Sequence, residues 1–187
     1  RSVYNSMTSR LLVDKIEGKA TSGTINIPNH IINVTQAVKT DTQTASAFTF
    51  VDITGLSVTV NPVSTSSKFF INFLVRGASN YFTSYVRLLR NSTELGANAD
   101  GSGDSRLRIA SAIVEDQGPS NSHGIMHDHN FQLVDEPNTT SALTYKLQMS
   151  GRRTTDYMHV NRSVPDRQQT EYDTRSISML QVFEIGG

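Results

Sequence analysis

The sequence contains no cysteine among its 187 residues. Small secreted domains usually depend on disulfides, so this absence favours assembly in a reducing cytosol or a fold large enough to need no cross-link. No run of about 18 apolar residues occurs, and no membrane-spanning helix is therefore predicted. Residues 1–7 also lack the apolar core of a signal peptide.

The sequence has no excess of charge of either sign. Lys and Arg number 17, Asp and Glu number 17, and the formal net charge is zero. Nucleic-acid partners require a basic surface that displaces counterions, so no such partner is predicted. No Gly-x-Ser-x-Gly motif or comparable nucleophile signature occurs. The sequence therefore favours a non-enzymatic protein that needs no cofactor.

What the chain does contain is a period-two pattern, clearest over residues 48–91. Apolar and polar residues alternate over 56–60, as in a strand with one buried face. A nearly continuous apolar run over 69–75 is typical of a strand covered on both faces, in the middle of a sandwich or at a subunit contact. With a third strand over 85–89, we predict an antiparallel meander.

The same pattern recurs along the rest of the chain, and no helix longer than a turn or two is predicted. Strand spacing of about ten residues is typical of all-β sandwiches and barrels. We predict an antiparallel β-sandwich head domain, jelly-roll-like, over residues 30–187. Its further strands are expected at 31–38, 48–53, 106–114, 126–134, 143–150 and 176–185.

Residues 1–29 form a segment with too little apolar content to fold alone. We predict an extended N-terminal anchoring arm, ordered only through contact with another protein as a strand added to an exposed sheet edge. Its main apolar residues are Leu11, Leu12, Val13, Ile16, Ile25 and Ile27.

Several apolar residues fall on strand faces where a monomer would carry polar ones. A symmetric oligomer would bury such faces, so the sequence predicts self-association. The residues concerned are Leu74, Val75, Phe82, Val134 and Val182.

Residues 12–28 and 52–68 resemble consecutive stretches of tail-fibre-like proteins of marine and cyanobacterial bacteriophages. Residues 85–91, 135–148 and 176–185 continue the resemblance in the same order, so that it covers most of the chain. The shared motifs are strand and turn motifs without catalytic residues. The resemblance implies a homotrimeric β-sandwich head on a phage virion, assembled in the host cytoplasm, whose arm contacts other virion proteins.

Two roles are compatible with this resemblance. One is a tail fibre head that binds a glycan receptor on the host surface, and the other is a capsid decoration or cement protein that stabilises the shell. Long polar loops on a rigid sandwich often carry recognition, and exposed aromatic rings can stack on sugars. The candidate glycan contacts are Tyr157, Arg152, Arg153, Asp156 and Tyr172, although the tyrosines could instead pack against the sandwich edge.

His127 and His129 lie two residues apart on a predicted strand. Alternation places both imidazoles on the same face, about 7 Å apart at the backbone. Repeated around a threefold axis they would offer nitrogen ligands to a metal such as zinc or nickel. The alternative is that the two histidines line a polar interface or a loop mouth.

Overall fold

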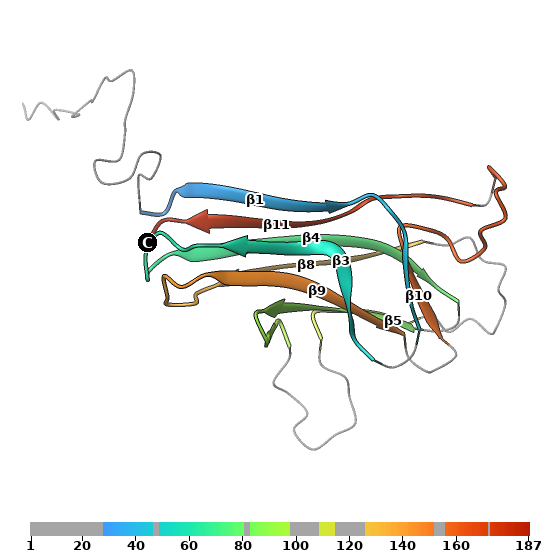
Figure 1. The fold of residues 1–187 in the computed structure, drawn as a ribbon, viewed down its shortest axis with the longest axis horizontal. Coiled ribbons are helices and arrows are strands. Elements are labelled where there is room, and N and C mark those ends of the chain that lie inside the picture. Colours follow the sequence, from blue (N-terminus) through green and yellow to red (C-terminus); the bar gives the residue numbers. More distant parts are fainter. Residues whose placement is uncertain are drawn as a thin grey trace, which may run out of the picture.

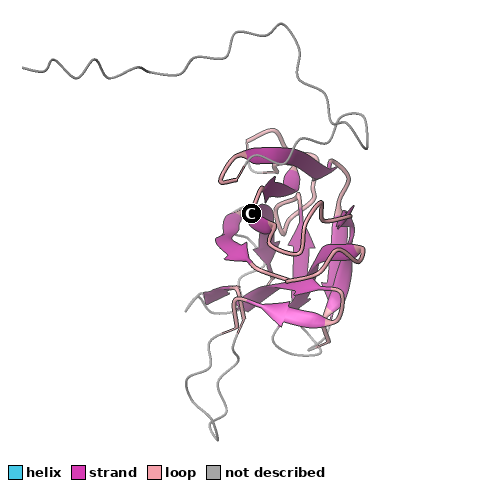
Figure 2. Ribbon diagram, turned by 90° about the vertical axis from the view of Figure 1, so that its left-hand side faces the viewer, coloured by secondary structure: helices cyan, strands magenta, loops and turns pink. Residues whose placement is uncertain are grey.

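The computed structural model describes residues 28–46, 49–80, 83–97, 109–114, 126–151, 156–171 and 173–187. These residues form eleven β-strands and no helix, and none of their segments is a helix that could span a membrane (Figure 2). The strands are β1 (Ile31–Lys39), β2 (Gln43–Ser46), β3 (Val51–Val60), β4 (Lys68–Ser79), β5 (Thr83–Arg90), β6 (Thr93–Leu95), β7 (Ser111–Val114), β8 (His127–Asp135), β9 (Leu143–Gly151), β10 (Tyr157–Val160) and β11 (Ser178–Ile185).

The strands form two antiparallel sheets, which confirms the predicted all-β sandwich (Figure 1). One sheet has the order β1-β11-β4-β10-β2, with β8 also paired to β4. The other has the order β3-β9-β5-β6, with β7 also paired to β5. The long pairs are nested in the sequence, since β1 pairs with β11, β3 with β9, β4 with β8 and β5 with β7. Successive pairs alternate between the two sheets.

This arrangement shows that the predicted meander is wrong. β3 and β5 belong to the five-stranded sheet, whereas β4 between them belongs to the six-stranded sheet. In the turn between β3 and β4, the Ser67 amide donates to the Ser64 carbonyl (3.1 Å). After such a turn the next strand can either pair with the previous strand or cross to the opposite sheet. Strands far away in the sequence decide between these two outcomes. β9 pairs with β3, whereas β4 lies between β11 and β8.

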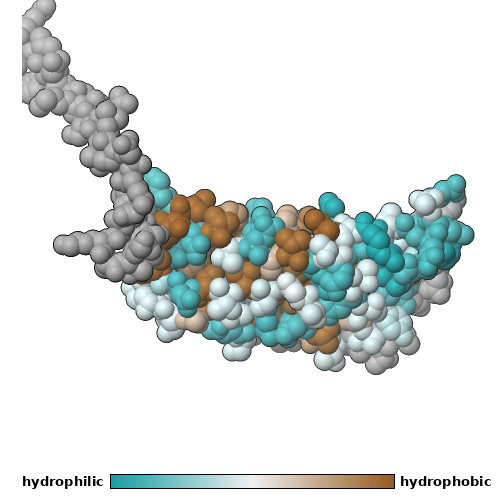
Figure 3. Space-filling view, turned by 45° about the horizontal axis from the view of Figure 1, so that its top comes forward, coloured by the Kyte–Doolittle hydropathy of each residue, from teal (hydrophilic) through white to brown (hydrophobic). Residues whose placement is uncertain are grey.

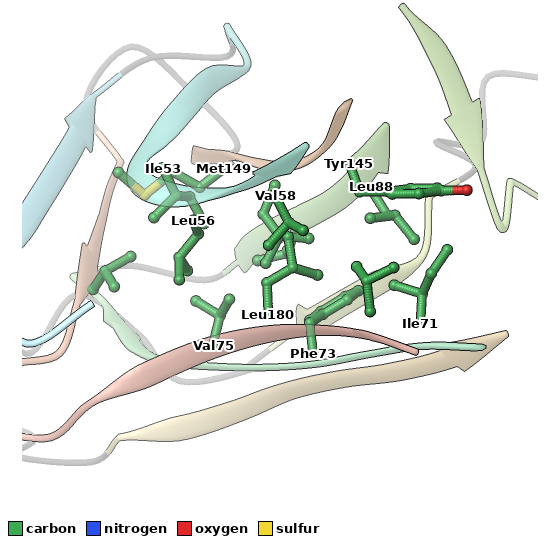
Figure 4. Packing of buried hydrophobic residues seen from close by; sticks show 14 of the residues in the cluster. Ile53, Leu56, Val58, Ile71, Phe73, Val75, Leu88, Tyr145, Met149 and Leu180 are labelled. Atoms are coloured by element: carbon green, nitrogen blue, oxygen red, sulfur yellow. The ribbon is translucent and has the colours of Figure 1, made fainter. Parts of the chain in front are cut away.

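The hydrophobic core lies between the inner faces of the two sheets (Figure 4). Alternation along β4 turns every second apolar residue inward, and each of these side chains is fully buried. Burial of a large apolar side chain contributes roughly 1.5–3 kcal/mol, so this layer carries most of the stability of the sandwich. Its central members are Phe69, Ile71, Phe73, Val75, Leu180 and Val182 from one sheet and Ile53, Leu56, Val58, Leu88, Tyr145, Leu147 and Met149 from the other.

A buried polar network closes one end of the core. The Tyr145 hydroxyl donates to Asp135 Oδ2 (2.7 Å), and Arg90 Nη1 donates to Asp135 Oδ1 (2.5 Å). Burial, reinforced by the hydrogen bond to Asp135, raises the pKa of Tyr145, so its hydroxyl stays protonated and remains a donor. The network satisfies the Asp135 carboxylate where β8 passes the opposite sheet.

Candidate functional site: an interaction surface

The outward-pointing side chains of β1, β11, β4 and β8 form one continuous surface, which we call the outer face. Strand register aligns these side chains in rows that run across the four strands. One row is apolar throughout, and the rings of Phe70 and Phe183 within it lie 5.8 Å apart. Hydrophobic surface accordingly extends along the side of the molecule that carries β1 and β11 (Figure 3). This row, the valine–phenylalanine row, contains Val34, Phe183, Phe70 and Val134.

The next row lies two residues further along β4, at Asn72. It consists of four amide side chains, and we call it the amide row. Asn72 Nδ2 donates to Gln181 Oε1 (3.0 Å), and Gln132 Nε2 donates to Asn72 Oδ1 (3.2 Å). These side chains are therefore held against the sheet by one another and carry no charge. The amide row contains Gln36, Gln181, Asn72 and Gln132.

A second apolar row follows the amides, formed by Val38, Met179 and Leu74, with Asn130 at the β8 position. Gln36 Nε2 reaches into this row and donates to the Met179 sulfur (3.9 Å). Two apolar rows thus enclose one row of neutral amides.

Ion pairs mark both ends of the outer face. Arg76 on β4 pairs with Asp128 on β8 (3.1 Å), and Lys68 at the start of β4 pairs with Glu136 just after β8 (2.7 Å). In each pair the cation belongs to β4 and the anion lies on the β8 side. The charges balance at each end, so the outer face has no net attraction for an ion of either sign.

The outward surface of the five-stranded sheet is quite different. Lys146 pairs with Asp52 (3.0 Å), and Gln148 Nε2 donates to the same carboxylate (2.6 Å). Arg87 links Gln148 (2.8 Å) to Glu94 (3.2 Å). This charged, hydrogen-bonded surface suits contact with water, which makes the apolar outer face the surface most in need of a partner.

The size of the exposed apolar area supports that conclusion. Val34 is 56% exposed and Val134 is 52% exposed, although both lie within nine-residue strands. Contiguous apolar patches of this kind on a soluble domain usually mark contacts with other molecules. The outer face is therefore the candidate functional site.

The residues predicted to lie on doubly apolar faces divide into three groups. Leu74 and Val134 lie on the outer face as expected. Val75 and Val182 do not, because strand alternation turns both into the core, where they are 0% and 1% exposed. Phe82 lies outside the described residues.

His127 and His129 share the inward face of β8, as alternation predicted. His129 is fully buried, with Nε2 2.9 Å from the Ser84 hydroxyl and Nδ1 3.1 Å from the Ser111 hydroxyl. Burial, with a smaller effect of nearby His127, lowers the pKa of His129 to about 4, so the imidazole is neutral near pH 7. A metal bound by either ring nitrogen would have to displace the hydroxyl partner of that nitrogen, and the metal site stays a prediction. Among the described residues, no three His, Cys, Asp or Glu side chains are grouped as ligands.

The candidate glycan contacts are only partly brought together. Tyr157 on β10 is 40% exposed, and its ring stacks on His159 with centroids 6.4 Å apart. Asp156 is fully buried, which contradicts its assignment to a surface sugar site. The backbone of Asp156 lies close to that of Gly151, where an added Cβ would be 2.4 Å from the Asp156 carbonyl oxygen. Arg152, Arg153 and Tyr172 lie outside the described residues.

The structure adds His159, which the sequence did not suggest. Its Nδ1 lies 2.9 Å from the Thr44 hydroxyl of β2, and burial lowers its pKa to about 4. The contact joins β10 to a strand more than 100 residues earlier, so only the fold could reveal it. His159 therefore lies beside the exposed Tyr157 ring on β10, with the two ring planes nearly parallel.

The junction of the predicted arm lies at one end of the outer face. The Asn29 amide donates to the Gly186 carbonyl (2.7 Å), and the Gly186 amide donates to the His30 carbonyl (2.9 Å). Asn29 has a left-handed backbone (φ 65°), so the chain turns sharply where it enters β1. The apolar arm residues Leu11, Leu12, Val13, Ile16, Ile25 and Ile27 lie outside the described residues, and their role stays a prediction.

Comparison with known proteins gives little guidance. No protein-family model matches the chain, and no curated protein matches it. A structure of infectious bursal disease virus, Gx strain, is 14% identical over 96% of this chain, with a TM-score of 0.36. The crystal structure of the infectious bursal disease virus VP2 subviral particle is 13% identical over 92%, with a TM-score of 0.39. The chain spans about half the length of these proteins (46% and 45%), and likenesses this low assign neither a family nor a role.

Proposed function

We propose that this protein is a non-enzymatic structural subunit of a bacteriophage virion that assembles as a homotrimer through its outer face. The observation that carries the proposal is the contrast between the two sheets. One turns a charged, hydrogen-bonded surface outward, and the other turns out two apolar rows around uncharged amides. Burial of the outer face between copies would remove its apolar side chains from water, which is the main driving force for obligate association. The sequence resemblance to tail-fibre-like proteins supports the virion context and the trimer.

We also propose that the sandwich is a jelly roll. The support is the nesting of four strand pairs that are divided between two sheets, as in a double-sheet fold built from two Greek keys. Such a fold leaves the loops at the two ends of the strands free to vary while the sheets hold the subunit together.

The favoured role within the virion is a tail fibre head that binds host-surface glycan near Tyr157. An exposed aromatic ring offers a flat apolar surface on which a sugar ring can stack, and the nearly parallel ring of His159 lies beside it. Substitution of Tyr157→Ala is expected to weaken glycan binding about tenfold, which corresponds to about 1.4 kcal/mol. A glycan array with the trimer, followed by adsorption to host cells, measures this. Thr59→Ala, on the five-stranded sheet, is the control. If the two variants bind glycan equally well, Tyr157 is not part of the receptor site.

The alternative role is a capsid decoration or cement protein held to the shell by the arm. An image of the whole particle separates the two roles, because a tail fibre head would appear at the tail and a decoration protein would appear repeatedly over the capsid. Density absent from both places would contradict the virion role.

Deletion of residues 1–27 is expected to leave the head folded and to abolish incorporation into the particle. Among the residues that the structure describes, all eleven strands lie after the deletion, and the fully buried part of the core begins at Ala45. Thermal melting of the full and truncated chains and counting of the protein in purified particles check both parts. A head that unfolds on truncation would show that the arm belongs to the core and would contradict its anchoring role.

A further inference from the structure

We infer that the three copies meet through the outer face around an axis parallel to its strands, so that each row of one copy meets the same row of the next. This inference rests on the proposed homotrimer and specifies its geometry. The rows run across the strands and are spaced about 7 Å apart along them, since outward residues repeat every second position. Rotation about an axis parallel to the strands leaves each row at its own height.

The chemistry of the rows favours this register. The valine–phenylalanine row then packs against its own copies, and the second apolar row does the same. Each amide carries both donors and an acceptor, so the amide rows of three copies can bond to one another. A shift of one row would bury amides against valine and phenylalanine, and an unpartnered buried amide costs about 1–3 kcal/mol. The amide row therefore acts as the element that fixes the register.

The ion pairs argue against the main alternative, a dimer with its twofold axis along the amide row. That axis would also place amides on amides, but it reverses the strands. Lys68 and Arg76 are each four residues from Asn72, so the Lys68 of one copy would face the Arg76 of the other. Glu136 and Asp128 would likewise approach each other across the contact. Around an axis parallel to the strands, each height carries both members of one ion pair, and the β1 edge rather than the like-charged strand of the next copy meets β8.

Paired cysteine substitutions test this geometry without background, because the chain has no native cysteine. Gln36→Cys and Gln132→Cys in one chain place thiols at opposite edges of the amide row, on β1 and β8. Within one chain three strand spacings, roughly 14 Å, separate them, so they cannot form an internal disulfide. In the trimer the β1 edge of one copy meets the β8 edge of the next. Mild oxidation is expected to give covalent trimers on a non-reducing gel.

Val38→Cys with Val134→Cys is the matched control. These residues occupy the same two strands but lie two rows apart, roughly 13 Å along the strands, and should not cross-link. Melting of both reduced variants confirms that they are folded. Two results would overturn the row-to-row geometry in a chain that is still trimeric by light scattering. One is covalent dimers alone, and the other is cross-linking of the control pair in place of the test pair. Either result would leave the proposed homotrimer intact. An unsubstituted chain that is monomeric would overturn the proposed function as well.

Discussion

Lowering the pH from 7 to 4 is expected to destabilise the sandwich sharply through His129. The imidazole is fully buried between the sheets, where Ser84 of β5, Ser111 of β7 and His127 of β8 surround it. Its pKa falls from the ordinary 6.5 to about 4, mainly through burial. Between these values the unfolded chain binds a proton that the folded chain excludes. The contribution is therefore complete above pH 6.5, declines as the pH falls, and is fully lost below pH 4.

The expected loss at His129 is roughly 3 kcal/mol, a large fraction of the stability of a typical domain. His159 shifts in the same direction and adds to it. Urea unfolding at pH 7 and pH 4 measures the effect, and His129→Gln should reduce the difference between the two. His30→Gln changes an exposed histidine and is the control. An unchanged pH dependence in His129→Gln, or an NMR titration of His129 near pH 6.5, would contradict this account.

Substitution of Leu74→Glu is expected to dissociate the oligomer into folded monomers. Leu74 lies in the second apolar row, between Met179 of β11 and Asn130 of β8. Around a threefold axis a carboxylate there would enter the contact three times, each without a partner, and burial of an unpaired charge costs several kcal/mol. Light scattering reports the mass, and circular dichroism confirms the β-structure.

Thr59→Glu provides the matched control for Leu74→Glu. Thr59 is an exposed residue of β3 that faces outward from the other sheet, where its hydroxyl lies 3.0 Å from that of Thr144. The same charge at this position should leave the oligomer intact. If both variants keep the mass of the parent, the outer face is not the contact between copies.

The faces of individual strands could be predicted from the sequence because alternation is a local property. The buried face over 56–60 and the shared face of His127 and His129 follow directly from spacing. The strand pairing could not be predicted in this way. β3, β4 and β5 have the spacing of a meander, yet none of them pairs with another of the three, and each has a long partner far along the chain. The four-residue strands β2 and β10 were not predicted. They pair with each other, but they lie more than 100 residues apart in the sequence.

The candidate site was predictable only in part for the same reason. Leu74 and Val134 were recognised as apolar residues on unexpected faces, and this indicated association. The amide row was not recognised, because Gln36 and Gln181 look like ordinary solvent-facing residues until register places them beside Asn72. A row is a property of four strands at once, and no local pattern in a single strand contains it.

The mass of the full chain in solution tests the central claim most directly. Size-exclusion chromatography with light scattering should give three times the 20.6 kDa mass of the chain, independent of dilution through the micromolar range. The apolar rows of the outer face would then be buried between copies. A stable monomer of 20.6 kDa with the same β-structure would contradict the claim, since the outer face would remain open to water without a second copy.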